Sequence, residues 1–292
     1  MIIFAAIAGC LSDKFLTYKN IVNVLNQSSM NGILALGLTT VILTGGIDIS
    51  VGSTLAFAGA TAATLLPNYG VIPAVLAALV VGFVVGTING VLISHWKLQP
   101  MIVTLATMSI FRGATYLLTG GRPISVSDPA FRIIGSGAIG KTVVAPIIVM
   151  MTLLLVMYYL LNKTKFGRHI YAVGGNEDAA FLSGVNTERT KTWAYIISGV
   201  LAAVAGLVIT ARLASAQPTA GSSYEMDAIA AAVIGGTSLR GGQGKVVFSI
   251  VGALIIAMLY NALTLMDVST YYQTVIKGIV IVSAVLIDAK KK

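Results

Sequence analysis

Side chains that could do chemistry are scarce in this sequence, and the most isolated of them is Asp48. Between Asn20 and Trp96 it is the only formally charged residue. A carboxylate in so long an apolar stretch is a functional candidate, because burying a charge in lipid is costly. Yet glycines precede it and Ser50 follows it, and an aspartate in such a turn commonly caps the next helix. Two interpretations stay open: a helix cap, or a residue of a pathway or gate.

Catalytic and metal sites need more such groups than the chain supplies. Two histidines and Cys10 are too few for a metal cluster of the usual kind, so we expect no metal ion and no cofactor. No nucleophile stands with a histidine and a carboxylate at workable positions. The run from Gly241 to Lys245 resembles a phosphate-binding loop, but Val246 replaces the hydroxyl residue that would hold Mg²⁺. We therefore expect no enzymatic activity.

A polar insert at residues 162–191 carries the clearest signal of local structure. Asn176 is a good N-cap, and Glu177 and Asp178 would lie in the first turn, where carboxylates meet the positive end of the helix dipole. Gly184 can close the helix in the left-handed conformation. The pattern predicts a two-turn helix outside the membrane, formed by Asn176, Glu177, Asp178, Ala179, Ala180, Phe181, Leu182, Ser183 and Gly184.

So short a helix is marginal in water by itself, and Phe181 and Leu182 therefore need something to pack against. One possibility is the protein's own helix ends or the lipid interface. The other is a groove on a partner protein, which receives the helix. A charged residue at Leu182 distinguishes them: loss of function with membrane insertion intact favours the partner.

The elements that must position these residues follow from composition. Of the 292 residues 57% are hydrophobic and 10% charged, with a mean hydropathy of +0.91. In soluble domains about a quarter of the residues are charged, so this chain is predicted to be a polytopic membrane protein. The net charge of +9 comes from few residues between apolar spans, which excludes nucleic-acid binding as its explanation.

The sequence predicts an all-α transmembrane helical bundle of about 8–10 spans, since about 20 apolar residues cross a bilayer. Eight spans are clear, near residues 28–47, 51–66, 71–94, 99–119, 143–161, 192–213, 246–266 and 271–287. Met1–Leu11 is too short to cross alone, and Met226–Gly236 is interpreted as a half-helix or re-entrant segment. The polar insert is too small to fold separately, so residues 1–292 are expected to form one transmembrane domain.

Basic residues orient such a bundle, because they prefer the cytoplasmic side. With ten crossings and cytoplasmic termini, more lysines and arginines fall inside than outside. Those inside are Lys97, Lys163, Lys165, Arg168, Arg189, Lys191, Arg240, Lys245, Lys290, Lys291 and Lys292. Those outside are Lys14, Lys19, Arg122, Arg132, Lys141 and Arg212. The polar insert is thus predicted to be cytoplasmic.

Two further groups of residues are functional candidates. The pattern Gly-Gly-x-x-Ile/Leu-x-x-Gly occurs at residues 45–52 and again at 235–242, and it could place two broken helices at one pathway. Coincidence in a glycine-rich chain is the alternative. The candidate pathway or gate residues are Gly45, Gly46, Asp48, Ser50, Gly235 and Gly236. On the outside, three basic residues could contact acidic patches of another protein or lie in a solvated loop: Arg122, Arg132 and Lys141.

Several runs of residues, taken together, resemble a known family. They are Gly45-Gly46-Ile47-Asp48-Ile49-Ser50-Val51-Gly52-Ser53, Gly174-Gly175-Asn176-Glu177 through Gly184, Ser215-Ala216-Gln217-Pro218-Thr219-Ala220-Gly221, Gly235-Gly236-Thr237-Ser238-Leu239 and Gly241-Gly242. In order and spacing they are similar to those of ribose-type permeases of ATP-binding-cassette importers, over nearly the whole chain. The segment from Asp178 to Gly184 is similar to the Glu-Ala-Ala-x-x-x-Gly signature of these permeases, with Asp in place of Glu.

The resemblance implies a permease pair, expected to be a homodimer in the lipid bilayer, a cytoplasmic ATPase and an extracytoplasmic sugar-binding protein. It also implies that the helix at residues 176–184 is the coupling helix, which docks on the ATPase. Members usually have a longer first helix, so the first crossing here departs from the pattern. The expected location is the bacterial cell (inner) membrane, which the chain would cross many times.

The function that follows is the membrane-spanning subunit of an ATP-driven monosaccharide importer, with ribose as the first choice. Other substrates of the same machinery are alternatives: another sugar, a signalling furanone or a branched-chain amino acid. An ion-coupled secondary transporter would also have broken helices, and transport without any ATPase would reveal it. A membrane scaffold, the third alternative, predicts no flux of substrate.

Overall fold

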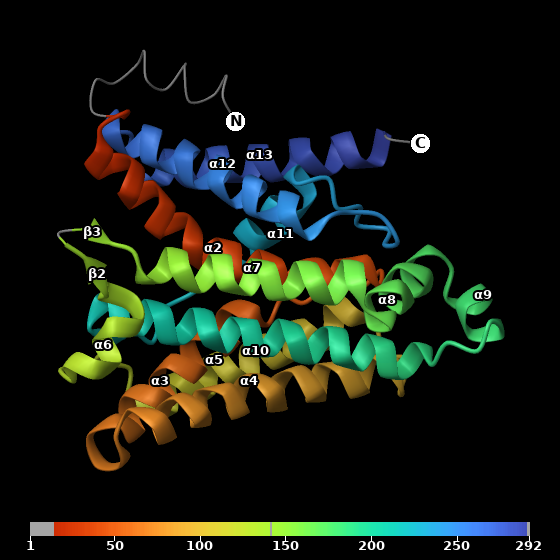
Figure 1. Cartoon of the computed structure of the whole chain (residues 1–292), viewed down its shortest axis with the longest axis horizontal. Coiled ribbons are helices and arrows are strands. Elements are labelled where there is room, and N and C mark those ends of the chain that lie inside the picture. Colours follow the sequence, from red (N-terminus) through yellow and green to blue (C-terminus); the bar gives the residue numbers. More distant parts are fainter. Residues whose placement is uncertain (1–14, 141, 291–292) are drawn as a thin grey trace.

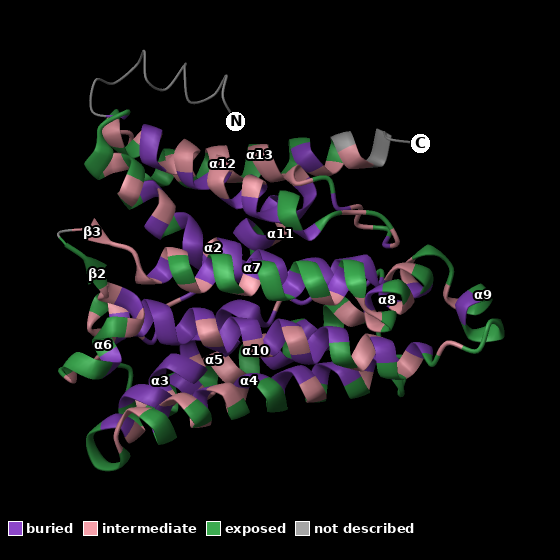
Figure 2. Cartoon of the chain, viewed as in Figure 1, coloured by how far each residue is buried: buried purple, intermediate pink, exposed green. Residues whose placement is uncertain are grey.

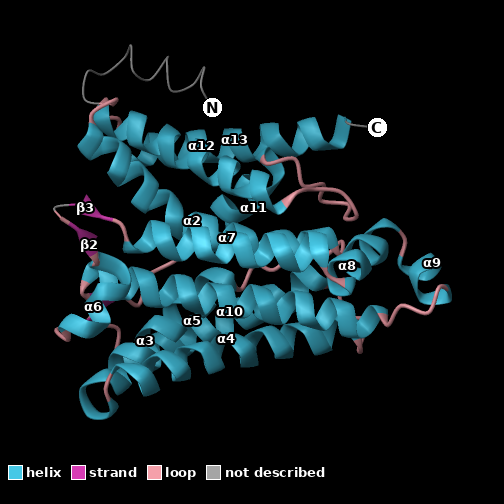
Figure 3. Ribbon diagram, in the orientation of Figure 1, coloured by secondary structure: helices cyan, strands magenta, loops and turns pink. Residues whose placement is uncertain are grey.

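The computed structural model describes residues 15–140 and 142–290, which form mostly helices (Figures 1 and 3). The helices are α2 (Tyr18–Leu43), α3 (Val51–Tyr69), α4 (Val71–Ser94), α5 (Pro100–Thr119), α6 (Pro129–Ser136), α7 (Ala145–Lys163), α8 (Lys165–Gly175), α9 (Glu177–Leu182), α10 (Thr187–Leu213), α11 (Tyr224–Ile234), α12 (Val246–Leu265) and α13 (Thr270–Lys290). The strands β1 (Ile124–Ser125) and β4 (Ser215–Ala216) pair antiparallel, as do β2 (Ala138–Ile139) and β3 (Thr142–Val143). The segment Met1–Leu11 and Lys141 lie outside the described residues.

Each of the eight predicted spans is found as one helix, which confirms the helical bundle. Five helices are long and apolar enough to cross a membrane by length and composition, namely α4, α5, α7, α10 and α12, and α13 has a shorter apolar stretch. Helix α2 begins at Tyr18, well before the predicted start at residue 28. The polar residues there find partners on other elements: Asn20 donates to Oδ1 of Asn261 at 2.7 Å, and Asn26 to the Val143 carbonyl at 2.9 Å.

The core lies around α2 and α10, which run through the middle of the bundle (Figure 2). One apolar cluster joins α2 to α7, α10, α11 and α12, and a second joins α3 and α4 to α10. Close approach of α4 and α10 depends on glycine. A Cβ on Gly82 would overlap the backbone of Gly199, and one on Gly86 would overlap that of Ile196. Such small residues let helices associate by direct packing in lipid.

A broken crossing separates α10 from α12. After α10 the chain runs through β4 and several turns, and then forms the short helix α11. The prediction of a half-helix near Met226–Gly236 is confirmed, with a shift of two residues. Arg112 on α5 supports the non-helical part, because it donates hydrogen bonds to the carbonyls of Pro218 (2.9 Å) and Ala220 (2.7 Å). Backbone that leaves helical geometry at membrane depth is tolerated when protein groups satisfy it in this way.

The two ends of the bundle differ. Helices α8 and α9 project from one end, while α6 and the β2–β3 hairpin cover the opposite end (Figure 1). The α8–α9 end carries most of the basic residues between spans, so the sequence-based prediction that it faces the cytoplasm applies to this end.

Candidate docking surface at the α8–α9 end

Helix α9 is formed by caps at both of its ends, as the sequence predicts. The Asn176 side chain accepts a hydrogen bond of 2.9 Å from the amide of Ala179. At the other end Gly184 has φ +84° and donates to the Phe181 carbonyl at 2.9 Å, while Val185 donates to the Ala180 carbonyl at 3.0 Å. This pair of bonds is a Schellman motif, which closes a helix with glycine in the left-handed conformation. Because these interactions are local, the six-residue helix is well defined by its own sequence.

The two large apolar side chains of α9 are exposed. Ala180 is buried, but Phe181 is 66% exposed and Leu182 is 84% exposed. Packing against the protein's own helix ends is therefore wrong for Leu182, while the lipid interface, the other part of that alternative, stays a prediction. Both side chains are thus accessible to another molecule, as the partner-groove alternative requires.

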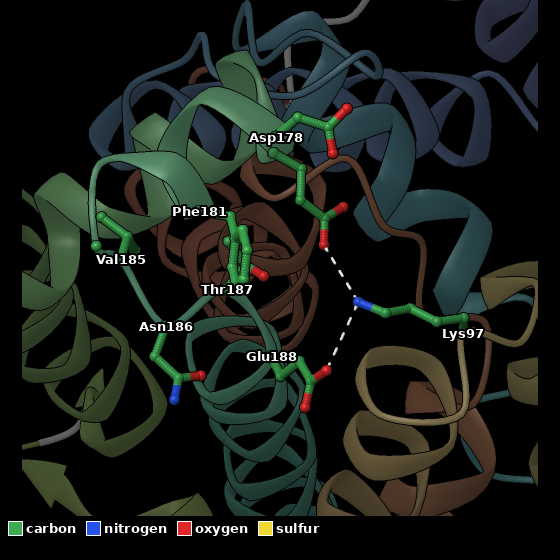
Figure 4. A pocket seen from close by; sticks show the side chains of 9 residues that line it. Lys97, Asp178, Phe181, Val185, Asn186, Thr187 and Glu188 are labelled. Atoms are coloured by element: carbon green, nitrogen blue, oxygen red, sulfur yellow. Dashed lines mark ion pairs between the residues drawn. The ribbon is translucent and has the colours of Figure 1, made fainter.

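Charged residues connect α9 to the rest of this end. Lys97, in the turn between α4 and α5, lies 3.8 Å from Glu177 of α9 and 3.8 Å from Glu188 of α10 (Figure 4). Glu177 also pairs with Lys191, and Glu188 with Nδ1 of His95 at 3.2 Å. Each exposed pair contributes little alone, at most about 1 kcal/mol, but together they join three separate elements.

Two hollows flank this charged cluster. The first has a volume of about 870 Å³ and lies between Lys97, Phe181 and Glu188. The second, of about 670 Å³, is lined by Phe166, Trp193 and other residues of α7, α8 and α10. A partner protein of complementary shape could bind the exposed helix α9 and fill these two hollows.

Helix α8, which precedes α9, is joined to the bundle by a glycine junction, defined here as Leu43, Gly45, Gly174, Gly241 and Gly242. The Gly242 amide donates to the Leu43 carbonyl at 2.9 Å, and a Cβ on Gly174 would overlap that same carbonyl. The α8 end, the α2 end and the loop after α11 therefore meet through their backbones.

Tyr171 of α8 adds a second link to that loop. Its hydroxyl donates to the Gly244 carbonyl at 2.9 Å. Burial raises the pKa of the Tyr171 phenol, so the hydroxyl remains a donor throughout the neutral pH range.

Asp48 lies in a buried polar network, and it is 1% exposed. Its Oδ1 accepts from the amide (3.0 Å) and hydroxyl (2.6 Å) of Ser50, just before α3, and its Oδ2 accepts from Ser198 of α10 at 2.8 Å. Asn89 of α4 donates to the Ser50 hydroxyl at 2.9 Å and accepts from Thr107 of α5 at 2.8 Å. The Asp48 carboxylate closes a turn just before α3, but it does not cap that helix, because the N-cap is Ser50 and no side-chain cap bond is made there. The network joins α3, α4, α5 and α10, and both sequence-based interpretations of Asp48 stay predictions.

The remaining glycine candidates are spread over this end. A Cβ on Gly45 would lie 3.7 Å from the Arg240 carbonyl, in the glycine junction, and one on Gly46 would meet the Tyr195 hydroxyl. Gly235 packs against the backbone of α12, while nothing lies within 4 Å of a Cβ on Gly236. The repeated pattern is not a repeated conformation, because Gly45 has φ +80° and Gly235 has φ −68°.

The basic residues expected outside lie at the opposite end. Arg122 follows α5 and Arg132 lies on α6, both exposed, and Lys141 is outside the described residues. Sequence reasoning missed Lys97 and Lys191 as partners of Glu177 in α9, and Glu188 as a second partner of Lys97. Their separation along the chain leaves no local signal, although all three are charges near span ends. Within the described residues, no group of three or more His, Cys, Asp or Glu residues is placed to hold a metal ion.

Comparisons with known proteins agree over nearly the whole chain. Residues 20–285 match the family described as branched-chain amino acid transport system, permease component. The ribose import permease protein RbsC of Haemophilus influenzae is 49% identical over 296 residues, covering 99% of this chain and 90% of that protein. RbsC of Bacillus subtilis is 48% identical, covering 100% and 91%. The D-allose transport system permease protein AlsC of Escherichia coli is 40% identical, covering 98% and 88%.

No solved structure gives a significant match to the chain. The family match leaves out only short stretches at the two ends, and relatives well above 30% identity align across the same length. This chain therefore belongs to the family of permease components described for branched-chain amino acid transport systems.

Proposed function

We propose that this chain is the membrane-spanning subunit of an ATP-driven ribose importer. The observation that carries the proposal is the 49% identity to a ribose import permease across 99% of the chain. As a permease component the chain is not an enzyme, and its ATPase is a separate subunit. It is a multi-pass protein of the bacterial inner membrane that works with an ATPase and a substrate-binding protein.

Helix α9 is the part of the chain that docks on the ATPase in this proposal. Exposure of Phe181 and Leu182 supports it, because a groove on the ATPase would bury both side chains. The ion pairs of Lys97 and Lys191 with Glu177 would carry the movement of α9 to α4 and α10. The glycine junction would carry it to α2 and to the loop after α11.

The proposal also assigns the dimer, the pathway and the outer contact. Residues 1–292 act as one transmembrane domain, and two copies of it form a homodimer that encloses the pathway. The candidate pathway or gate residues are Gly45, Gly46, Asp48, Ser50, Gly235 and Gly236. At the outer end Arg122, Arg132 and Lys141 meet acidic groups of the sugar-binding protein, since complementary charge guides such encounters.

Reconstitution tests this function directly. Vesicles that contain the permease and its ATPase, with ATP on the ATPase side and binding protein on the other, should accumulate labelled ribose. Omission of either partner or of ATP should abolish accumulation. Competition by allose, xylose, a furanone or leucine identifies the substrate. Uptake driven by a proton or sodium gradient without the ATPase would overturn the ATP-driven mechanism in favour of a secondary transporter.

A further inference from the structure

The second hollow beside α9 is a groove between two membrane-spanning helices. Helices α7 and α10 both pack on α2 and contact each other little, and α8 packs against both of them (Figure 1). The space that they leave open has a volume of about 670 Å³, and we name it the α7–α10 groove. Its walls include one residue of α7, two of α8 and three of α10: Leu160, Phe166, His169, Arg189, Trp193 and Ile197.

The groove runs from the polar end of α10 into its apolar part. Asn186, the N-cap of α10, and Ile197 both line it, and they lie about 16 Å apart along the helix. Leu160 and Ile197 belong to helices that are long and apolar enough to cross a membrane. A soluble partner docked on α9 could cover the outer end of the groove, near Gly184. The inner end lies at the depth of the bilayer, where a lipid is the molecule at hand.

Aromatic side chains mark the membrane interface at this end of the groove. Trp193 is exposed on α10, and Tyr158 and Tyr159 are exposed near the end of α7. Tryptophan and tyrosine gather where lipid head groups meet the hydrocarbon. The polar part of the groove, with Arg189 and His169, therefore lies at the level of the head groups, and Ile197 lies at the level of the acyl chains.

Four cations at the outer part of the groove have no acidic partner. Arg189 lines the groove, and Lys163, Lys165 and Arg168 are exposed on the α7–α8 segment that forms one of its walls. Within residues 15–140 and 142–290 none of the four forms an ion pair. The first hollow is lined by three acidic residues, whereas none of the described residues that line the α7–α10 groove is acidic. The groove is thus complementary to an anion.

An apolar strip continues from the groove along both helices. Val149 and Leu153 lie on the same face of α7 as Leu160, and Val204 lies two turns beyond Ile197 on the same face of α10. All of these residues are half-buried and packed against the core around α2. An acyl chain that enters the groove therefore finds apolar side chains along its further course.

We propose that the α7–α10 groove binds an anionic phospholipid, with the phosphate at Arg189 and an acyl chain along Leu160, Trp193 and Ile197. A guanidinium can form two parallel hydrogen bonds with a phosphate, and a ring nitrogen of His169 can donate another. Basic recesses between spans attract anionic head groups in this way. The bound lipid would connect α8 to α7 and α10, close to the segment that carries α9.

A zwitterionic phospholipid fits the groove less well. Its choline or ethanolamine group is cationic and would lie among Lys163, Lys165 and Arg168. No carboxylate in the described lining is available to balance that charge. An anionic head group such as glycerol phosphate adds no cation, so the lining favours phosphatidylglycerol over phosphatidylcholine.

Fluorescence of Trp193 tests occupancy of the groove without any transport. The chain has two tryptophans, so a Trp96→Phe permease in vesicles reports on Trp193 alone. Lipids with brominated acyl chains quench an indole that they touch. Brominated phosphatidylglycerol should displace phosphatidylcholine from Trp193 with a preference of about fivefold or more. In Trp193→Phe the remaining Trp96, beside the paired Lys97, should show no such preference.

A substitution at Arg189 tests the contact with the phosphate. The side chain is exposed and forms no ion pair in the described part of the chain, so the fold should tolerate Arg189→Gln. Loss of this cation should lower the preference at Trp193 about fivefold. Arg240→Gln, at an exposed position of the same end outside the groove, is the matched control and should keep the preference.

Three results would overturn the lipid site. The first is equal quenching of Trp193 by brominated phosphatidylglycerol and brominated phosphatidylcholine, and the second is equal preference in Arg189→Gln and Arg240→Gln. The third is loss of co-purification with the ATPase in Arg189→Gln with the lipid preference unchanged, because the groove would then belong to the protein partner. Relief of quenching by inorganic phosphate at constant ionic strength would likewise assign the groove to a soluble anion. None of these measurements involves ribose, so failure of ribose uptake would remove the proposed function and leave the lipid site standing.

Discussion

The carbonyl oxygen of Leu43 accepts a hydrogen bond of 2.9 Å from the amide of Gly242, which joins the end of α2 to the loop between α11 and α12. Gly174, at the end of α8, fits against the same carbonyl with no room for a Cβ. A backbone contact thus links the segment that carries α9 with two transmembrane elements. Because the backbones are in direct contact, a displacement of α8 would also displace the ends of α2 and of the loop after α11.

Gly174→Ala should disturb this contact. The added Cβ would overlap the Leu43 carbonyl and force α8 away from α2, a strain of about 1–3 kcal/mol. We expect ribose uptake to fall about tenfold, with ATPase binding retained, since α9 itself is unchanged. Gly175→Ala is the matched control, because nothing lies within 4 Å of its Cβ. Equal uptake by the two variants would show that the junction does not transmit movement.

Leu182→Asp tests the docking of α9. The side chain is 84% exposed, so the free permease should fold and insert normally. A charge placed in an apolar groove should weaken ATPase binding by about tenfold or more, measured by co-purification and by ATP-dependent uptake. Ile139→Asp, at a 72% exposed position on the opposite end, should leave ATPase binding unaltered. Normal binding by Leu182→Asp would remove α9 from the docking surface.

Substitutions at Asp48 separate its two interpretations. Asn keeps an oxygen for the Ser50 amide and can donate to the Ser198 hydroxyl, so Asp48→Asn should transport within about twofold of the wild type if the residue only stabilises the turn before α3. Asp48→Ala removes the acceptor of three buried hydrogen bonds and should lower the thermal midpoint, by an amount that reflects about 1–3 kcal/mol. Loss of transport in a stable Asp48→Asn protein would instead favour the gate.

Reversal of charge at the outer end tests the contact with the binding protein. Arg122→Glu and Arg132→Glu together should raise the concentration of binding protein that gives half-maximal uptake, because steering by opposite charge is lost. The wild type should show the same rise at high salt, because the screening length falls from about 10 Å at 0.1 M salt to about 3 Å at 1 M salt. ATPase binding should not change. A response identical to the wild type at every salt concentration would place these arginines in an ordinary solvated loop.

Local patterns were sufficient for a large part of this molecule. Apolar runs of about 20 residues located the spans, and Asn176 and Gly184 defined α9, because a helix cap depends on residues only three or four positions away. The break before α12 could likewise be predicted, since Met226–Gly236 is too short to cross and ends in glycine. In each case the decisive interaction lies within one short stretch of chain.

The remaining contacts and conformations could be seen only in the tertiary structure. The early start of α2, the partners of Asp48 on α10 and those of α9 on the α4–α5 turn all join residues far apart in sequence. Glycine spacing suggested a repeat, yet Gly45 and Gly235 differ in conformation, because packing against different neighbours sets their dihedral angles. The cavity lined by Asn31, Arg212, Asp227 and Tyr260 is formed by four helices together, and no single segment encodes a cavity whose walls come from distant spans.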